Sequence, residues 1–138
     1  MKTRFVWLLL FMSATASAEW EKVKGTEGTS AEKFIDTETM RQTGPMNTMR
    51  RVWEISNLAK GASNKALSNV LSIKSQVEYD CKDRRVRVLE ESYFSEPWAK
   101  GETLTEPAPE IKSRDWRGIV KGSIQETVFN RVCPNDGS

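Results

Sequence analysis

Two cysteines, Cys81 and Cys133, are the only ones in the chain, and their pairing is the strongest single constraint on its fold. In an oxidising compartment an isolated pair usually forms a disulfide. The alternatives are two free thiols or half of a metal site. A tetrahedral zinc site needs four ligands, commonly with two cysteines close in sequence, and this chain has no close pair and no histidine. We therefore expect a bridge, which would stabilise the fold by up to about 4 kcal/mol.

The N-terminus has the composition of a secretory signal peptide, which would place the chain in an oxidising compartment. Lys2 and Arg4 precede an apolar run that ends at Met12, and small residues with an Ala-x-Ala end follow. A membrane-spanning helix needs about 20 apolar residues, so this run is too short for an anchor. We expect residues 1–18 to be cleaved, leaving residues 19–138 as one domain with no membrane anchor.

The charge balance argues against nucleic acid as a partner. The full chain has 21 basic and 19 acidic residues and a net charge of +2. Loss of Lys2 and Arg4 with the signal peptide removes that excess. The remaining neutral domain would lack the long-range field that attracts proteins to nucleic acid or to anionic lipid.

Hydrophobic patterning predicts an antiparallel sheet. Ile73–Cys81 alternates, with Cys81 on the buried face and Glu78 and Asp80 on the opposite, solvent-facing side. The chain then returns as a partner strand, so that Ser72–Phe94 forms a hairpin with a charged tip. Further strands are expected at four places: Trp20–Lys24, Lys33–Asp36, Met49–Leu58 and Glu102–Thr105.

Three segments are predicted to lie between these strands. Asp36 can cap a turn at Thr37–Met40. Ala59–Asn69 is compatible with a loop or with one or two turns of helix, and the sequence does not decide between them. Ser95–Arg114 holds three prolines and is predicted to be a long connection.

The C-terminal element has the clearest local signals. Ser123–Glu126 has the pattern of a capping box, in which the serine accepts from the third amide and the glutamate accepts from the serine N–H. An apolar stripe of period 3.6 follows and Pro134 ends it, which predicts a helix over Ile124–Val132. The sequence therefore predicts an α+β fold: a small antiparallel β-sheet with a C-terminal helix packed on it and tied by the Cys81–Cys133 disulfide.

A set of residues in a fixed order extends from the end of the signal peptide to the second cysteine. They are Glu19–Trp20, Phe34–Asp36, Val52–Trp53, Glu78–Cys81, Arg84–Arg85, Tyr93, Trp116, Gly122–Ser123 and Val132–Cys133. In this order the chain resembles the surface-adhesin protein E family of proteobacterial envelope proteins. The most specific part is Tyr79–Cys81 followed by the arginine pair, with the second cysteine ending a helix.

The resemblance implies a small antiparallel sheet with a C-terminal helix and a non-enzymatic role. In the best-known members of the family, that role is adhesion to host extracellular-matrix and serum proteins. Those members are lipid-anchored at the cell surface. In this chain no cysteine comes directly after the apolar run, where a lipid anchor would be attached. The periplasm is therefore the expected location, with the cell surface or secretion as alternatives.

Arg84, Arg85 and Arg87 form the densest basic cluster and are candidate partner-binding residues. On a strand Arg85 and Arg87 share a face, and their planar guanidiniums can bind carboxylates or sulfated glycans in a bidentate manner. Arg50 and Arg51 would add to this surface if their strand were a neighbour. Acidic residues of the same hairpin could instead balance the cluster as an ordinary solvated face.

Trp98 is the other candidate contact residue. It lies in the predicted proline-containing connection, and tryptophan is frequent at the centres of protein interfaces. Alternatively, its ring folds back over the edge of the sheet.

The search for catalytic residues is negative. Without histidine, Ser-His-Asp and Cys-His arrangements are excluded. The chain has no glycine-rich phosphate loop, and both cysteines belong to the predicted bridge. Glu90 and Glu91 are adjacent on a strand and point to opposite faces, so they cannot act on one substrate. We expect no enzyme activity, no cofactor and no metal.

The sequence thus predicts an exported, non-enzymatic envelope protein that acts as a protein- or glycan-binding, adhesin-like module. The alternative is a structural or assembly protein of the periplasm, or a homodimer that pairs the exposed edges of its sheet.

Overall fold

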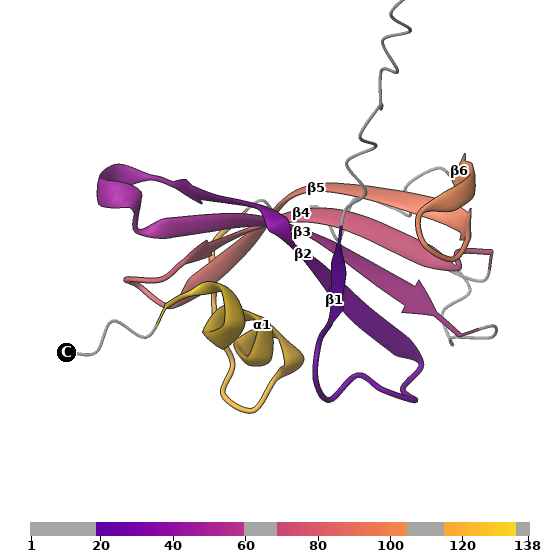
Figure 1. The fold of residues 1–138 in the computed structure, drawn as a ribbon, viewed down its shortest axis with the longest axis horizontal. Coiled ribbons are helices and arrows are strands. Elements are labelled where there is room, and N and C mark those ends of the chain that lie inside the picture. The colour runs from indigo at the N-terminus through magenta and orange to yellow at the C-terminus, as the bar shows by residue number, and fades with distance from the viewer. Residues whose placement is uncertain (1–18, 60–68, 105–114, 135–138) are drawn as a thin grey trace, which may run out of the picture.

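The computed structural model describes residues 19–59, 69–104 and 115–134, which form one antiparallel sheet with a helix on one face (Figure 1). The strands are β1 (Trp20–Lys22), β2 (Ala31–Thr43), β3 (Met49–Leu58), β4 (Ser72–Asp80), β5 (Arg85–Glu96), β6 (Lys100–Leu104) and β7 (Arg117–Gly118). The helices are a short 3-10 turn, η1 (Pro45–Asn47), and α1 (Ile124–Val132). From β1 to β6 the strands follow chain order across the sheet, and β7 pairs with the start of β5. The predicted fold class is confirmed.

One predicted turn is wrong. Thr37–Met40 does not interrupt the strand, because β2 continues to Thr43 with a shift of register between Asp36 and Arg41. The Asp36 carboxylate accepts hydrogen bonds from the backbone N–H groups of Glu38 and Thr39, at 3.1 and 3.3 Å. These bonds satisfy the backbone donors that the irregularity removes from the ladder, so the strand bends without ending.

The predicted long connection is also wrong in its first part. Residues 95–104 complete β5, turn tightly and return as β6, which begins at Lys100 rather than at Glu102. The later part of that connection, residues 105–114, lies outside the described residues. Most of Ala59–Asn69 lies outside them as well.

The hydrophobic core lies between α1 and one face of the sheet (Figure 1). The helix contributes Val128, Phe129 and Val132, all buried. They pack on apolar side chains of five strands or strand ends, namely Val23, Ile35, Val52, Val77, Tyr79 and Val86. Burial of these side chains is the main force that holds the helix against the sheet.

Two tethers hold α1 near its C-terminal end. The Cys81–Cys133 disulfide joins the end of the helix to the end of β4, with Cα atoms 5.5 Å apart. Arg131 donates to both carboxylate oxygens of Glu21 on β1, at 2.7 and 2.8 Å. The helix is therefore connected to both halves of the sheet.

The predicted helix bounds are confirmed, but only half of the capping box forms. The Ser123 hydroxyl accepts from the Glu126 N–H at 3.1 Å, as expected. The Ser123 N–H instead donates to the Val120 carbonyl, in a turn that precedes the helix. The Glu126 carboxylate accepts from the Gly122 N–H at 3.2 Å.

We expect the Cys81→Ser/Cys133→Ser variant to lose about 2–4 kcal/mol of unfolding free energy, because the bridge restricts the unfolded chain over a separation of 52 residues. Urea denaturation of the oxidised protein and of the variant measures the difference. A loss below about 0.5 kcal/mol would contradict this expectation and would mean that core packing and the Arg131–Glu21 pair hold α1 unaided.

Candidate partner-binding surface

The face of the sheet opposite α1 is built around one buried carboxylate. Glu78 lies on the central strand β4, and its side chain is only 2% exposed. In the register of the sheet its cross-strand partners are Arg51 on β3 and Arg87 on β5. The sheet therefore places one guanidinium on each side of this carboxylate.

Glu78 accepts five hydrogen bonds. Its Oε1 accepts from Nε and Nη2 of Arg87 at 3.0 and 2.6 Å. Its Oε2 accepts from Nε and Nη2 of Arg51 at 3.2 and 2.8 Å, and from the Thr43 hydroxyl at 3.0 Å. This saturation offsets the cost of removing the charge from water.

A second buried carboxylate lies one step along the same face. Asp80 has a side chain 3% exposed, and its Oδ2 accepts from Arg85 Nε at 2.9 Å. Its Oδ1 accepts from the backbone N–H groups of Lys82 and Asp83, both at 3.1 Å. Asp80 thus stabilises the β4–β5 turn and also orients Arg85.

The prediction that Glu78 and Asp80 face solvent is wrong, because both are buried under arginines of the neighbouring strands. Burial alone would raise the pKa of each carboxyl. Hydrogen bonds from Arg87, Arg51 and Thr43 outweigh that effect and lower the pKa of Glu78. Backbone N–H groups and Arg85 lower the pKa of Asp80 in the same way. Both groups are therefore anionic near neutral pH.

Trp116 lies against two of these arginines. The guanidinium carbons of Arg85 and Arg87 are 4.7 and 4.4 Å from the centre of its ring. Trp116 precedes β7, whose pairing with the start of β5 positions the ring at this edge of the sheet. Such contacts add cation–π attraction to the ion pairs and further restrict both side chains.

We call Arg51, Arg85, Arg87 and Trp116 the arginine surface. The three arginine side chains remain 38, 38 and 32% exposed, so solvent reaches them although their orientation is fixed. Arg41 lies directly opposite Arg51 in the sheet and adds a fourth guanidinium beside them. The arginine surface is an ordered array of half-exposed cations above buried anions.

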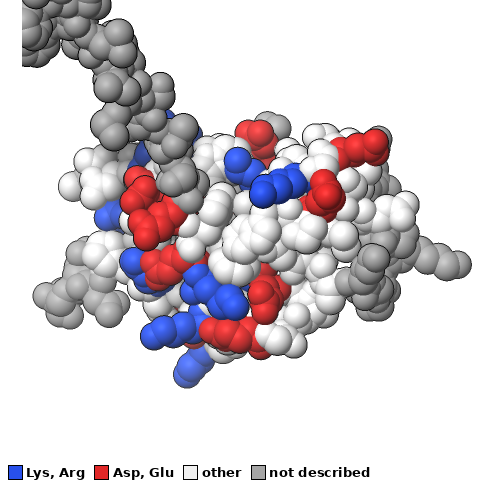
Figure 2. Space-filling model, turned by 45° about the vertical axis from the view of Figure 1, so that its right-hand side comes forward, with Lys and Arg blue, Asp and Glu red and all other residues white. Residues whose placement is uncertain are grey.

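On one face of the molecule, acidic side chains lie between the basic ones. Figure 2 shows one face of the molecule, on which basic and acidic side chains alternate. Asp83 similarly approaches Arg85, with 3.7 Å between carboxylate oxygen and Nη2. Any recognition here would depend on the local arrangement of groups more than on a long-range field.

The structure places the three arginines predicted to bind a partner on two different faces of the sheet. Arg85 and Arg87 share a face, as expected, and Arg51 joins them through Glu78. Arg84 points to the opposite face, where its guanidinium lies 4.7 Å from the ring centre of Phe129 and 3.3 Å from a Glu126 oxygen. Alternation along the strand places Arg84 on the side of α1.

Trp98 lies in the β5–β6 turn, at the opposite end of β5 from the arginine surface. Its ring folds back onto Phe34 of β2, with 4.4 Å between ring centres, and the residue is 41% exposed. The backbone N–H of Trp98 donates to Asn57 Oδ1 at 2.8 Å. Trp98 therefore packs against the sheet and remains partly exposed. This agrees with the alternative prediction that its ring folds back over the sheet.

Sequence reasoning did not identify Glu78 and Trp116 as parts of a binding surface. Alternation along the strand placed Glu78 on the solvent side, and only the arginines of the neighbouring strands gave a signal for its burial. No local signal indicated that Trp116 would contact Arg85 and Arg87.

Among the described residues, no group of three histidine, cysteine, aspartate or glutamate side chains is placed to hold a metal ion. In the same part of the chain, no helix has the length and apolar character needed to cross a membrane.

Fold and surface together define a class of small β-sheet domains that carry one disulfide-linked helix and leave a charged face open. The chain belongs to the surface-adhesin protein E family, whose sequence model matches residues 20–134. Membership of this family indicates an adhesin-like protein. A search of curated proteins gave no match to the sequence.

Solved structures of Haemophilus influenzae protein E share the fold. Crystal form II of that protein is 16% identical, with a TM-score of 0.59 over 77% of this chain and 83% of the other. Protein E from non-typeable Haemophilus influenzae is 12% identical, with a TM-score of 0.53 over 81% and 74% of the two chains. At these identities the likeness establishes the common fold alone.

We expect Glu78→Gln to lower the unfolding free energy by about 3 kcal/mol at pH 7, because it leaves Arg51 and Arg87 without their shared anion. The pKa of Glu78 is lowered by folding, so its contribution is complete above the unfolded-state value of about 4.5 and disappears as pH falls through the folded-state pKa. The difference between wild type and variant should therefore shrink as the pH falls from about 5 through the lowered folded-state pKa of Glu78.

Chemical denaturation at several pH values measures that difference, with the exposed Glu90→Gln as the matched control. A loss at pH 7 no larger than that of the control would contradict a structural role for the Glu78 carboxylate.

Proposed function

We propose that this protein is an exported envelope protein that binds another protein or a glycan through the arginine surface. The proposal rests on the hydrogen bonding of the guanidiniums of Arg51 and Arg87. Each gives Nε and Nη2 to Glu78, while its Nη1 group has no partner among the described residues. Donors that are fixed in direction and open to solvent are suited to a carboxylate or sulfate of a partner.

Fixed orientation also favours binding energetically. A free arginine loses side-chain entropy when a partner immobilises it, at a cost of about 0.5–1.5 kcal/mol per side chain. On the arginine surface the buried carboxylates and Trp116 have already restricted the guanidiniums. Arginine and tryptophan are also the residues most enriched among interface hot spots.

Family membership supports adhesion as the biological setting. The family is described as surface-adhesin protein E, and extracellular-matrix proteins are the partner class that this resemblance implies. Carboxylate and sulfate groups are abundant on such proteins and on the glycans attached to them. The surface described above offers the complementary cations.

Export is proposed from the sequence of residues 1–18, with cleavage before Glu19 and the periplasm as the first location. Fractionation of the native host into periplasm, outer membrane, cell surface and medium tests it, together with the intact mass of the recovered protein. We expect the mass of Glu19–Ser138 less two hydrogens. Retention of residues 1–18 would contradict export by this route, and recovery from the surface or medium would replace the periplasm as its location.

The binding proposal is tested with Arg85→Lys/Arg87→Lys, which keeps both charges but removes the fork of donors and the stacking on Trp116. We expect at least a tenfold loss of affinity for immobilised extracellular-matrix proteins or sulfated glycans, equivalent to about 1.4 kcal/mol. Surface plasmon resonance measures it on variants first shown to be folded by circular dichroism. Removing the arginines altogether would strand Glu78 and Asp80, so alanine variants are less informative.

Arg131→Lys is the control, because it makes the same change at an ion pair on α1. Equal affinities for wild type and the double variant would overturn the arginine surface as the binding site. Absence of binding to the whole panel would overturn the proposed class of partner.

A second candidate role is self-association through the sheet edge. β6 lies at the edge and has exposed residues from Lys100 to Thr103, and edge strands can pair with another chain. Sedimentation at several concentrations distinguishes this role from capture of a different partner.

A further inference from the structure

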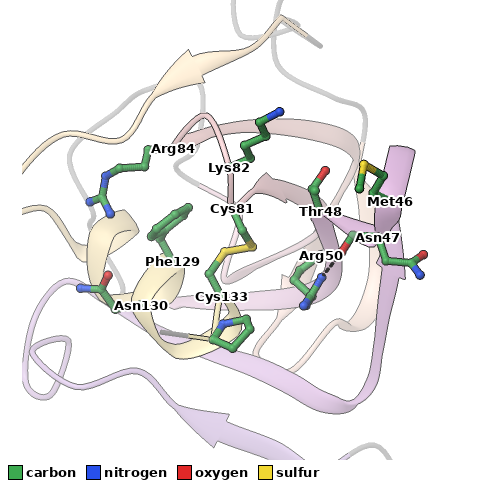
Figure 3. A pocket seen from close by; sticks show the side chains of 11 residues that line it. Met46, Asn47, Thr48, Arg50, Cys81, Lys82, Arg84, Phe129, Asn130 and Cys133 are labelled. Carbon is green, nitrogen blue, oxygen red and sulfur yellow. Dashed lines mark hydrogen bonds between the residues drawn. A yellow bond between two sulfur atoms is a disulfide. The ribbon is translucent and has the colours of Figure 1, made fainter. Parts of the chain in front are cut away.

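A second polar site lies on the other side of the molecule, beside the disulfide. The end of β4, the η1 segment and the end of α1 enclose a cavity of about 450 Å³ (Figure 3). The Cys81–Cys133 bridge and the ring of Phe129 form part of its wall, and the side chains of Arg50, Lys82 and Arg84 surround them. None of the arginine surface lines this cavity.

The charge around this cavity is unbalanced. Arg50, Lys82 and Arg84 line it, and none of the other described residues that line it is acidic. Only Arg84 has a carboxylate partner, Glu126 at 3.3 Å, which lies outside the lining. Arg50 donates its Nη1 to the backbone carbonyls of Asn47 and Met49, and the Lys82 ammonium has no partner among the described residues. In the described part of the chain, two of the three cations therefore have no acidic partner.

The carbonyl end of α1 offsets part of this charge. A helix C-terminus carries about half a negative elementary charge, and its effect falls off within the last turn. One of these carbonyls, that of Phe129, already accepts from the Cys133 N–H at 2.8 Å. The helix end therefore offsets only part of the charge of Arg50 and Lys82, so the described residues leave a positive excess in the cavity.

The walls are held in place before any ligand arrives. The bridge fixes the end of α1 against β4, and the guanidinium of Arg84 lies over the ring of Phe129. At the rim, Met46 and Arg84 have left-handed backbone conformations, with φ of 55° and 48°. That conformation is unfavourable for both residue types, and Met46 is 93% exposed, so no burial of its side chain explains it.

We propose that this cavity binds an acidic saccharide, a sugar unit that carries a sulfate, phosphate or carboxylate group. Arg50, Lys82 and Arg84 would take the anionic group, and the Asn47, Thr48 and Asn130 side chains offer donors and acceptors for sugar hydroxyls. The volume lies within the range of about 300–1,000 Å³ typical of small-ligand sites. This site goes beyond the arginine surface, and neither site requires the other.

Calorimetric titration of the oxidised protein with a heparin-derived sulfated disaccharide tests the proposal. Maltose serves as the neutral probe and glucose 6-phosphate as the phosphate-bearing one. We expect the sulfated or phosphorylated sugar to bind and maltose to give no signal. Affinity should fall steeply between 50 mM and 500 mM salt, because charge pairing at an open site is screened.

Lys82→Gln should weaken binding by about fivefold to tenfold, since it removes one charged hydrogen-bond donor from the cavity. Lys82 is exposed and forms no ion pair with another described residue, so this variant should fold normally. Lys100→Gln on β6, at the other end of β5, is the matched control and should bind as wild type does. Backbone amide shifts in NMR spectra should change at Thr48, Lys82 and Asn130.

Three results would overturn the site. They are equal affinity for maltose and the acidic sugars, equal affinity of Lys82→Gln and Lys100→Gln, and no binding by any probe. Arg85→Lys/Arg87→Lys separates the two sites, since it should leave this binding unchanged. If that variant abolished sugar binding while Lys82→Gln did not, the acidic sugar would belong to the arginine surface instead.

Discussion

The shared ion pairing of Glu78 with Arg51 and Arg87 is the interaction on which the open face of the sheet depends. A carboxylate removed from water is tolerated only when charged donors surround it, and here the two neighbouring strands supply them in direct register. A slip of one residue in either pairing would turn Glu78 to the apolar face of the sheet, where Val77 and Tyr79 lie. The buried charge therefore specifies the alignment of three strands while α1 covers only their other face.

The two faces of the sheet are thus stabilised by different means. On the helix side, apolar burial, a disulfide and the Arg131–Glu21 pair hold α1 in place. On the open side, ion pairs and hydrogen bonds stabilise the sheet in place of a packed layer. Because the strands are shared, residues next to one another in sequence serve separate surfaces: Arg84 borders the cavity beside the bridge, and Arg85 belongs to the arginine surface.

Much of the architecture could be predicted because its signals are local. The N-cap serine, the apolar stripe and Pro134 gave the bounds of α1, and alternation gave the central hairpin. The burial of Glu78 could not be predicted from alternation alone, because its partners come from strands whose register emerges only in the folded sheet. Likewise, Trp98 packs on Phe34 and Trp116 packs on Arg87, and the two residues of each pair are far apart in the sequence. At Thr37–Met40 the same side-chain bonds from Asp36 that favour a turn instead support an irregular strand.

The alternation of acidic and basic side chains has a consequence for the kinetics of partner binding. Without a broad field of one sign, a partner of the arginine surface would arrive at the ordinary rate of unsteered protein association, about 10⁵–10⁶ M⁻¹s⁻¹. Differences in affinity among partners would then arise mainly from how long each complex lasts. The guanidiniums held by Glu78 and Asp80 would act on dissociation, since a partner that leaves must break several aligned contacts almost at once.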